Sequence, residues 1–146
     1  MYKFPPDYQG SWKLGKEIYK EGICLHNGRN SEVSLIPTDI PGFHISFSDE
    51  PDKLITLNID QVRNTPLCTT LDLGTKSLST IEHLLAALVG CGLTHVHIHI
   101  SGSEIPLLDG SSLSWVEAIQ EAGLIKPKTV RKRIPLIKKP IFISKK

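Results

Sequence analysis

Hydrophobic and polar residues alternate through the first half of the chain, which is typical of strands that pack on one face only. Strand-like segments lie at residues 16–20, 23–26, 32–36, 43–47, 54–57 and 67–71. Turn-forming pairs such as Asn27-Gly28 and Pro41-Gly42 separate some of them. We therefore expect a series of short strands in this half of the chain.

Near residue 80 the spacing of the apolar residues changes from that of a strand to that of a helix. Four apolar side chains recur at i, i+3, i+4 and i+7: Ile81, Leu84, Leu85 and Leu88. This spacing predicts a helix over about residues 80–89, with a possible capping box formed by Ser79 and Glu82. Around His83 the opposite side of this helix carries Ala86, Ala87 and Gly90. A helix that is apolar on two sides is normally buried on two sides, so Glu82 and His83 are expected between two layers.

The remaining elements complete a fold-class prediction. Residues 93–100 read as a strand, 104–110 as a loop and 112–122 as a second helix that Gly123 ends. Several strands, a helix, a strand and a helix favour an α+β domain. We expect one mostly antiparallel sheet with two helices packed on one face.

Composition excludes several classes of protein. A chain of 146 residues with 40% hydrophobic and 22% charged residues fits one globular domain. It contains no apolar run long enough for a transmembrane segment, and residues 1–6 have no signal-peptide pattern. The three cysteines, Cys24, Cys68 and Cys91, are odd in number and widely spaced, which favours reduced thiols and a cytoplasmic location.

Basic residues are concentrated at the end of the chain. Nine of the seventeen Lys and Arg residues lie from Lys126 onward, where there is no acidic residue. Such a segment can bind a polyanion, but apolar residues such as Ile134 and Phe142 interrupt the charges, which favours a linker that runs into a strand. We expect residues 1–125 to form an N-terminal α+β domain and residues 126–146 to form a basic linker and the first strand of a missing second domain. No nucleic-acid partner is expected.

Glu82 and His83 are the first candidates for chemistry. An imidazole can bind zinc, and a neighbouring carboxylate can take a proton from the attacking water in hydrolysis. The structural alternative is that Glu82 only caps the helix and His83 is an interior histidine with satisfied hydrogen bonds. From the residues alone both readings stay open.

Other motifs carry weaker signals. His95, His97 and His99 alternate on one strand and could ligate zinc, but they equally fit the polar face of a half-buried strand whose apolar residues, such as Val96 and Ile98, face the core. We favour the second reading because no carboxylate on the strand orients the rings. Cys68 lacks a local His/Asn arrangement that would make it a nucleophile. Asp109 or Ser111 can cap the second helix.

Taken together, four ordered motifs resemble one family closely. They are residues 21–28 (EGICLHNG), 62–69 (VRNTPLCT), 79–88 (STIEHLLAAL) and 104–111 (EIPLLDGS). Their order and spacing resemble the N-terminal half of the UDP-3-O-acyl-N-acetylglucosamine deacetylases, the zinc amidases of lipid A biosynthesis. The resemblance implies two similar α+β domains that pack helix face to helix face, with the active site between them.

The resemblance also implies roles for individual residues. His83 matches a ligand of the Zn²⁺ cofactor, and Glu82 matches the general base. The loop near the metal and the substrate is matched by Leu67, Cys68 and Thr69, and the supporting positions near the site are matched by His26 and Asp109. The implied substrate is UDP-3-O-acyl-N-acetylglucosamine, which loses its N-acetyl group.

The chain departs from the family in what it lacks. The other two zinc ligands, the general-acid histidine, an oxyanion-binding threonine and most of the acyl-chain tunnel belong to the second domain. We therefore expect this chain to be inactive alone, since catalytic zinc sites normally need three protein ligands. The alternatives are a truncated, non-catalytic remnant that acts only by packing against another chain, and a self-contained zinc protein built on His95, His97 and His99.

Overall fold

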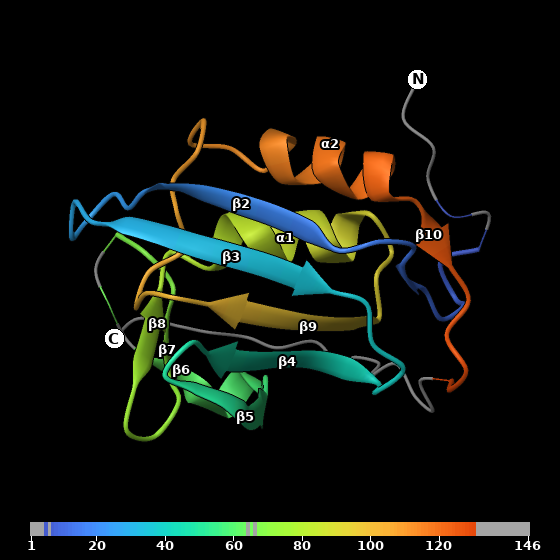
Figure 1. Ribbon diagram of the computed structural model, residues 1–146, viewed down its shortest axis with the longest axis horizontal. Coiled ribbons are helices and arrows are strands. Elements are labelled where there is room, and N and C mark those ends of the chain that lie inside the picture. Colours follow the sequence, from blue (N-terminus) through green and yellow to red (C-terminus); the bar gives the residue numbers. More distant parts are fainter. Residues whose placement is uncertain (1–4, 6, 64, 66, 131–146) are drawn as a thin grey trace, which may run out of the picture.

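The computed structural model describes residue 5, residues 7–63, residue 65 and residues 67–130. These residues form a seven-stranded sheet, a three-stranded sheet, two α-helices and a short 3-10 helix (Figure 1). The strands are β1 (Lys13–Leu14), β2 (Ile18–Ile23), β3 (Asn30–Ile36), β4 (Gly42–Phe47), β5 (Glu50–Thr56), β6 (Val62–Arg63), β7 (Thr70–Asp72), β8 (Ser77–Ser79), β9 (His95–Ile100) and β10 (Leu124–Ile125). The helices are η1 (Ile59–Gln61), α1 (Glu82–Gly90) and α2 (Leu113–Ala122). The expected α+β class is confirmed.

Strand β9 organises the larger sheet. It pairs antiparallel with β3 through residues 97–100. It pairs parallel with β4 over its whole length, from Gly42↔His95 to Phe47↔Ile100. Strand β2 extends the sheet beyond β3, and β5 extends it beyond β4. Apart from β4–β9, the short β1–β9 contact and an isolated parallel bridge between Ser79 and Glu104, the described pairings are antiparallel, as expected. The strands form two sheets, however, and not the one sheet predicted. A parallel pair needs a crossover, and the connection from β4 to β9 contains the smaller sheet, β6–β7–β8, and helix α1.

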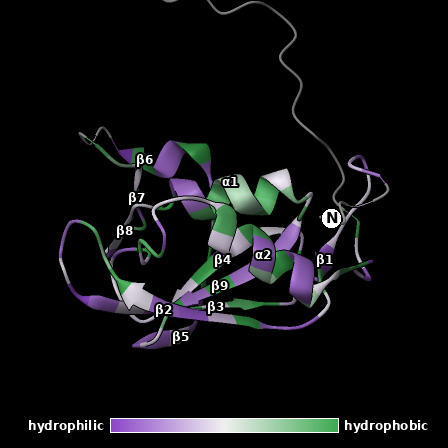
Figure 2. Cartoon of the chain, turned by 90° about the horizontal axis from the view of Figure 1, so that it is seen from above, coloured by the Kyte–Doolittle hydropathy of each residue, from purple (hydrophilic) through white to green (hydrophobic). Residues whose placement is uncertain are grey.

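Both helices lie on the same face of the larger sheet, as expected (Figure 2). Between them and the sheet lies a continuous apolar core whose central side chains are fully buried: Val33, Leu35, Val96, Ile98, Leu84, Leu88, Trp115 and Ile119. Each fully buried aliphatic side chain of this kind contributes about 1.5–3 kcal/mol. The alternation of Val96 and Ile98 with histidines therefore orients β9, as the pattern predicts.

Helix α1 buries most of its first apolar side, and its second only at Ala87, in the described part of the chain. Leu84, Ala87 and Leu88 are buried, whereas Ala86 is exposed and Val89 is 61% exposed. The second layer expected over the exposed side stays a prediction.

Several element boundaries differ from the sequence expectation, and three of the differences have a clear cause in the backbone. The strand expected at 16–20 is β2, which continues to Ile23 because Gly22 stays in the ladder opposite Ser31. Residues 24–26 of the second expected strand lie outside β2, at the turn that follows it. The strand expected at 67–71 starts only at Thr70, since Leu67 has a left-handed φ of 71° that a strand residue does not adopt. Helix α1 starts at Glu82 rather than at residue 80, because Thr80 also has a left-handed φ, of 60°.

The segment after α2 is tied to the first residues of the domain. Gly123, with φ 72°, ends the helix as predicted, and the next two residues form β10, which pairs with β1. The Lys126 ammonium lies 3.7 Å from the centre of the Trp12 ring, and the Lys128 N–H donates to Asp39 at 2.8 Å. The strand predicted within residues 126–146, and most of the basic linker, lie outside the described residues.

Membrane-spanning helices were searched for in the part of the chain that the structure describes. Neither α1 nor α2 has the length and apolarity needed to cross a membrane.

Candidate active site

Glu82 stands at the first position of α1 and binds the loop that precedes β7. Its Oε2 accepts a hydrogen bond of 3.1 Å from the main-chain N–H of Thr69. An acidic side chain in the first turn of a helix is also stabilised by the positive end of the helix dipole. Two residues singled out by separate motifs are therefore in direct contact.

The capping box expected between Ser79 and Glu82 is wrong. The N-cap residue of α1 is Ile81, which has no side-chain capping bond. Ser79 belongs to β8 instead, where its N–H donates to the Ser103 carbonyl and its hydroxyl lies 3.0 Å from that of Thr70. Because Ser79 is engaged in sheet pairing, the Glu82 carboxylate accepts its hydrogen bond from the loop before β7 and takes no part in a capping box.

The loop before β7 is held by short local contacts. The Thr65 hydroxyl donates to the Cys68 carbonyl at 2.6 Å, and the Cys68 thiol lies 3.6 Å from the Thr70 hydroxyl. Leu67 is 92% exposed and left-handed at the same time. Non-glycine residues with such backbone conformations are strained and occur preferentially at functional sites.

His83 follows Glu82 on α1 and is half-buried. Its ring makes no hydrogen bond with any residue between 7 and 130 that the structure describes. The interior histidine with satisfied hydrogen bonds, one of the two readings of the sequence, is therefore not what is observed. Both ring nitrogens remain available for a metal or a ligand from outside the described chain.

Sequence reasoning missed Glu104 as a residue of this site. Its carboxylate accepts three hydrogen bonds, from the His26 N–H at 2.9 Å, the Asn27 N–H at 3.0 Å and the Thr80 hydroxyl at 3.0 Å. The turn that carries His26 is thereby joined to the residues just before α1. The only signal in the sequence was its place at the head of the 104–111 motif, which by itself reads as a loop.

The ionisation of Glu104 follows from these contacts. Burial raises the pKa of the carboxyl, but the hydrogen bonds from His26, Asn27 and Thr80 outweigh burial and hold the pKa below its ordinary value. Glu104 is only 2% exposed, so its charge is compensated almost entirely by these protein donors.

Asp109 organises the start of α2. Its two oxygens accept from the N–H and the hydroxyl of Ser111, at 3.1 and 2.9 Å, and these bonds lower the pKa of the carboxyl. The Ser111 hydroxyl oxygen in turn accepts from the Leu113 N–H at 3.0 Å. The N-cap residue of α2 is Ser112, which makes no side-chain capping bond, so the cap predicted at Asp109 or Ser111 is wrong and Ser111 only holds the N–H of the first helical residue. No hydrogen bond among the described residues joins Asp109 to Glu82, His83 or Thr69, and its supporting role stays a prediction.

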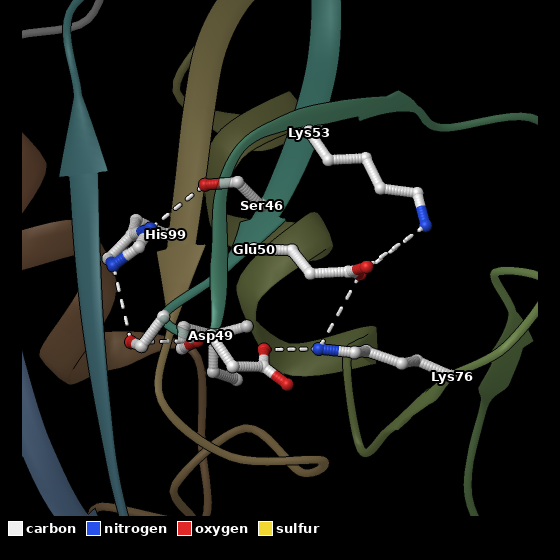
Figure 3. Close-up of polar contacts among 8 residues, drawn as sticks. Ser46, Asp49, Glu50, Lys53, Lys76 and His99 are labelled. Atoms are coloured by element: carbon white, nitrogen blue, oxygen red, sulfur yellow. Dashed lines mark hydrogen bonds and ion pairs between the residues drawn. The ribbon is translucent and has the colours of Figure 1, made fainter.

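The histidines of β9 do not form the solvated face that we expected. His95 is fully buried, with its ring against the hydroxyls of Thr94 at 2.7 Å and Thr129 at 3.2 Å. His97 and His99 are half-buried and share the Ser46 hydroxyl, at 2.7 and 2.8 Å, and Figure 3 shows the contact with His99. The expectation failed because the parallel partner β4 places Ser46 opposite His99. Burial lowers the pKa of His97, and the neighbouring His99 and His44 lower it further.

A surface concavity of about 630 Å³ lies beside the end of β4 and is not lined by Glu82, His83 or Thr69. Its lining includes Arg29, Phe47, Lys76 and Ser101, and none of the seven site residues predicted from the sequence. Lys76 pairs there with Asp49 and lies 3.7 Å from Glu50 (Figure 3). The Lys76 ammonium holds the pKa of Asp49 below its usual value. This hollow is therefore not the site that the 79–83 segment predicts.

The three cysteines are free thiols. Cys24 and Cys91 are buried, which raises the pKa of each thiol, and the Cys24 thiol donates to the Glu104 carbonyl at 3.3 Å. These two thiols are structural, as reduced and unreactive cysteines are expected to be.

Among the described residues, the site offers a carboxylate, which can accept a proton, and one imidazole. No group of three or more His, Cys, Asp or Glu side chains suited to a metal ion occurs within the described ranges. Catalytic zinc sites normally use three protein ligands. His83 could supply only one of them.

Comparisons with known proteins find similarity to the same family that the four motifs resemble. The family model of UDP-3-O-acyl N-acetylglycosamine deacetylase matches residues 12–146. A protein of Geobacter sp. (strain M21), named UDP-3-O-acyl-N-acetylglucosamine deacetylase, is 39% identical over 133 residues, which cover 89% of this chain and 43% of that protein.

Proteins of the same name in other bacteria are also similar. The one from Trichormus variabilis is 41% identical over 114 residues, or 77% of this chain and 41% of that protein. The one from Brucella melitensis biotype 2 is 30% identical over 127 residues, or 86% of this chain and 44% of that protein. The chain thus spans less than half the length of the curated relatives it matches.

Proposed function

The chain belongs to the UDP-3-O-acyl N-acetylglycosamine deacetylase family, and from that membership we propose that it is the N-terminal part of a zinc-dependent hydrolase. The proposed reaction removes the N-acetyl group from UDP-3-O-acyl-N-acetylglucosamine in lipid A biosynthesis. Water adds to the acetamide carbonyl, the C–N bond breaks, and acetate and a free amine leave. The contact between Glu82 and Thr69 is the observation that most directly supports this proposal, since it joins two of the family motifs.

Glu82 is the proposed general base. The Thr69 N–H occupies one carboxylate oxygen and fixes the side chain, while no described residue donates to Oε1. A carboxylate held in this way can accept the proton of the attacking water without first losing a competing partner. Its half-buried position at the head of α1 is compatible with access from the side of α1 that the described chain leaves uncovered.

His83 is the proposed zinc ligand of this chain. Its ring has no hydrogen-bond partner among the described residues and is adjacent to Glu82, which fits a metal ligand beside a base. Zinc in such a site would polarise the carbonyl and lower the pKa of the attacking water. Because this part of the chain offers one ligand and not three, we infer that the chain alone is inactive.

The exposed side of α1 is the proposed contact with a second domain. Ala86 and Val89 present small and apolar groups there, and the relatives are more than twice the length that this chain matches. Covering this side would enclose Glu82 and His83 between two layers. Leu67, Cys68, Thr69, His26 and Asp109 are proposed to line or support the same site. We also infer a cytoplasmic location, which the three free thiols support.

A chimeric enzyme tests the proposal. The 133 residues of the Geobacter relative that match this chain would be replaced by the matching residues of this chain. We expect the chimera to release acetate from UDP-3-O-acyl-N-acetylglucosamine and its Glu82→Gln variant to be almost inactive. A folded chimera that binds zinc but releases no acetate, while the unmodified relative is active, would contradict the proposal and favour the non-catalytic remnant.

A further inference from the structure

Glu104 connects two segments that are far apart in the sequence. One is the turn at His26 and Asn27, whose main-chain N–H groups donate to its two carboxylate oxygens. The other is Thr80, 24 residues away, whose hydroxyl donates to Oε1. With an exposed fraction of 2%, the carboxylate has these donors in place of water.

The start of α1 depends on this connection because the usual helix cap is missing. Ile81, the N-cap residue, makes no side-chain capping bond. The main chain is held at Ser79, two residues before the N-cap. Ser79 makes main-chain hydrogen bonds with Ser103 and Ile105, on either side of Glu104. Between this point and Glu82 lies Thr80 in a left-handed conformation, which is strained for a β-branched residue.

We propose that Glu104 is a positioning residue of the active site: its carboxylate holds the His26 turn and Thr80 together and so fixes the position of Glu82 and His83. This inference rests on the proposed function for its catalytic consequence. It does not require Glu104 to touch the substrate, the metal or the reacting atoms.

The chemistry of the three contacts indicates why a carboxylate is needed. Glutamate offers acceptor sites on two oxygens, and all three partners are donors. Glutamine has the same shape but offers one oxygen, so its NH₂ group would face a main-chain N–H. At least one of the three hydrogen bonds would be lost, and the connection between the two segments would be weakened.

The experiment measures kcat and KM in the chimera described above. We expect Glu104→Gln to lower kcat about tenfold or more, the scale of losses when groups that orient active-site ligands are removed, with KM changed less than about threefold. Thr80→Val, which keeps the β-branched shape and removes the hydroxyl, is expected to lower kcat in the same way. Thr80→Ser, which retains the hydroxyl, is expected to restore most of the activity.

A coupling measurement separates positioning from general loss of stability. The effects of Thr80→Val and Glu104→Gln on kcat should be less than additive in the double variant, because both remove the same connection. The matched control is Glu117→Gln, which removes an exposed carboxylate on α2 and should leave kcat and KM unchanged. Equal losses of kcat in Glu104→Gln and in Glu117→Gln would overturn the inference.

The outcome is separable from that of the proposed function. If Glu82→Gln inactivates the chimera and Glu104→Gln leaves kcat within about twofold, the function stands and the positioning role is wrong. If the folded chimera is inactive, amide hydrogen exchange on the 146-residue chain decides the point. Faster exchange at residues 24–28 and 79–84 in Glu104→Gln, with α2 unchanged, supports the inference, and unchanged exchange in both segments overturns it.

Discussion

The main-chain N–H of Thr69 donates to the carboxylate of Glu82 at 3.1 Å. Glu82 lies 13 positions after Thr69 in the sequence, with the whole β7–β8 hairpin between them. Because the donor is a main-chain group, the contact depends on the path of the loop and not on which side chain residue 69 carries. This relationship places a proposed base against a proposed substrate loop.

Replacement of Glu82 by Ala in the chimera is expected to lower kcat by about two to four orders of magnitude, the usual contribution of general acid–base catalysis. Bound zinc should remain close to that of the parent chimera, because Glu82 is not proposed as a ligand. Steady-state acetate release and metal analysis measure the two quantities. A variant with parental kcat would show that Glu82 is not the base.

Replacement of His83 by Ala is expected to lower the zinc content of the chimera strongly, with activity lost in parallel. The cause is the loss of one of the three ligands that a catalytic site needs. His99→Ala is the matched control, since His99 lies on β9 and is not among the residues assigned to the site. Unchanged zinc stoichiometry in His83→Ala would contradict the assignment.

Replacement of Val89 by Lys tests the exposed side of α1. Val89 is 61% exposed, so the free energy of unfolding of the 146-residue chain should change by no more than about 0.5 kcal/mol. In the chimera the same change should impair activity, because a charge would be buried against the proposed second domain. Full activity of Val89→Lys would indicate that this side stays open to solvent.

The stability contribution of Glu104 should depend on pH. Its folded pKa lies below the ordinary value of 4.5, so the charged, hydrogen-bonded form stabilises the fold above that value. The stabilisation is lost as the pH falls through the folded pKa. At pH 7 we expect Glu104→Gln to lower the free energy of unfolding by about 1–3 kcal/mol, the cost of losing hydrogen bonds to a buried charge.

Urea unfolding between pH 7 and pH 3 measures this effect. The difference between the wild type and Glu104→Gln should shrink toward low pH. The acidic groups that both proteins share, such as Asp39 and Asp49, cancel in that difference. A difference in the free energy of unfolding that is the same at pH 7 and pH 3 would contradict the prediction.

Replacement of Leu67 by Gly should not destabilise the chain, although glycine substitutions in loops usually do. The left-handed φ of 71° costs leucine about 1–2 kcal/mol, which glycine does not incur, and this gain offsets the larger entropy of glycine in the unfolded chain. Leu25→Gly, at another exposed leucine, has no such gain and should cost about 0.5–1 kcal/mol. Thermal unfolding of the two variants compares them, and equal losses would show that Leu67 is unstrained.

Local patterns predicted the elements whose signals are contained in a few neighbouring residues. The i, i+3, i+4, i+7 spacing of Leu84 and Leu88 located α1 within two residues at its start, and the alternation of Val96 and Ile98 predicted both β9 and its buried face. The boundaries failed where the backbone is left-handed, at Leu67 and Thr80. A left-handed φ at a leucine or a threonine is imposed by surrounding contacts, and no local propensity announces it.

For the histidines of β9, too, the sequence pattern predicted one property and strand pairing determined another. Their alternation correctly predicted that they share one face, but it gave no information about Ser46, 53 residues before His99. The depth to which they are buried follows from the register between β4 and β9, which is a property of the paired sheet.

The sequence by itself determined the α+β class, the apolar face of each main element and the identity of the Glu82–His83 pair, because each follows from residues adjacent in the chain or on one side of one element. Only the tertiary structure decided that Glu82 binds the Thr69 main chain and not the helix end, and that Glu104 joins the His26 turn to Thr80. The reason is that a carboxylate pairs with whichever donors the folded chain brings within about 3 Å, and strand pairing, not spacing along the sequence, selects those donors.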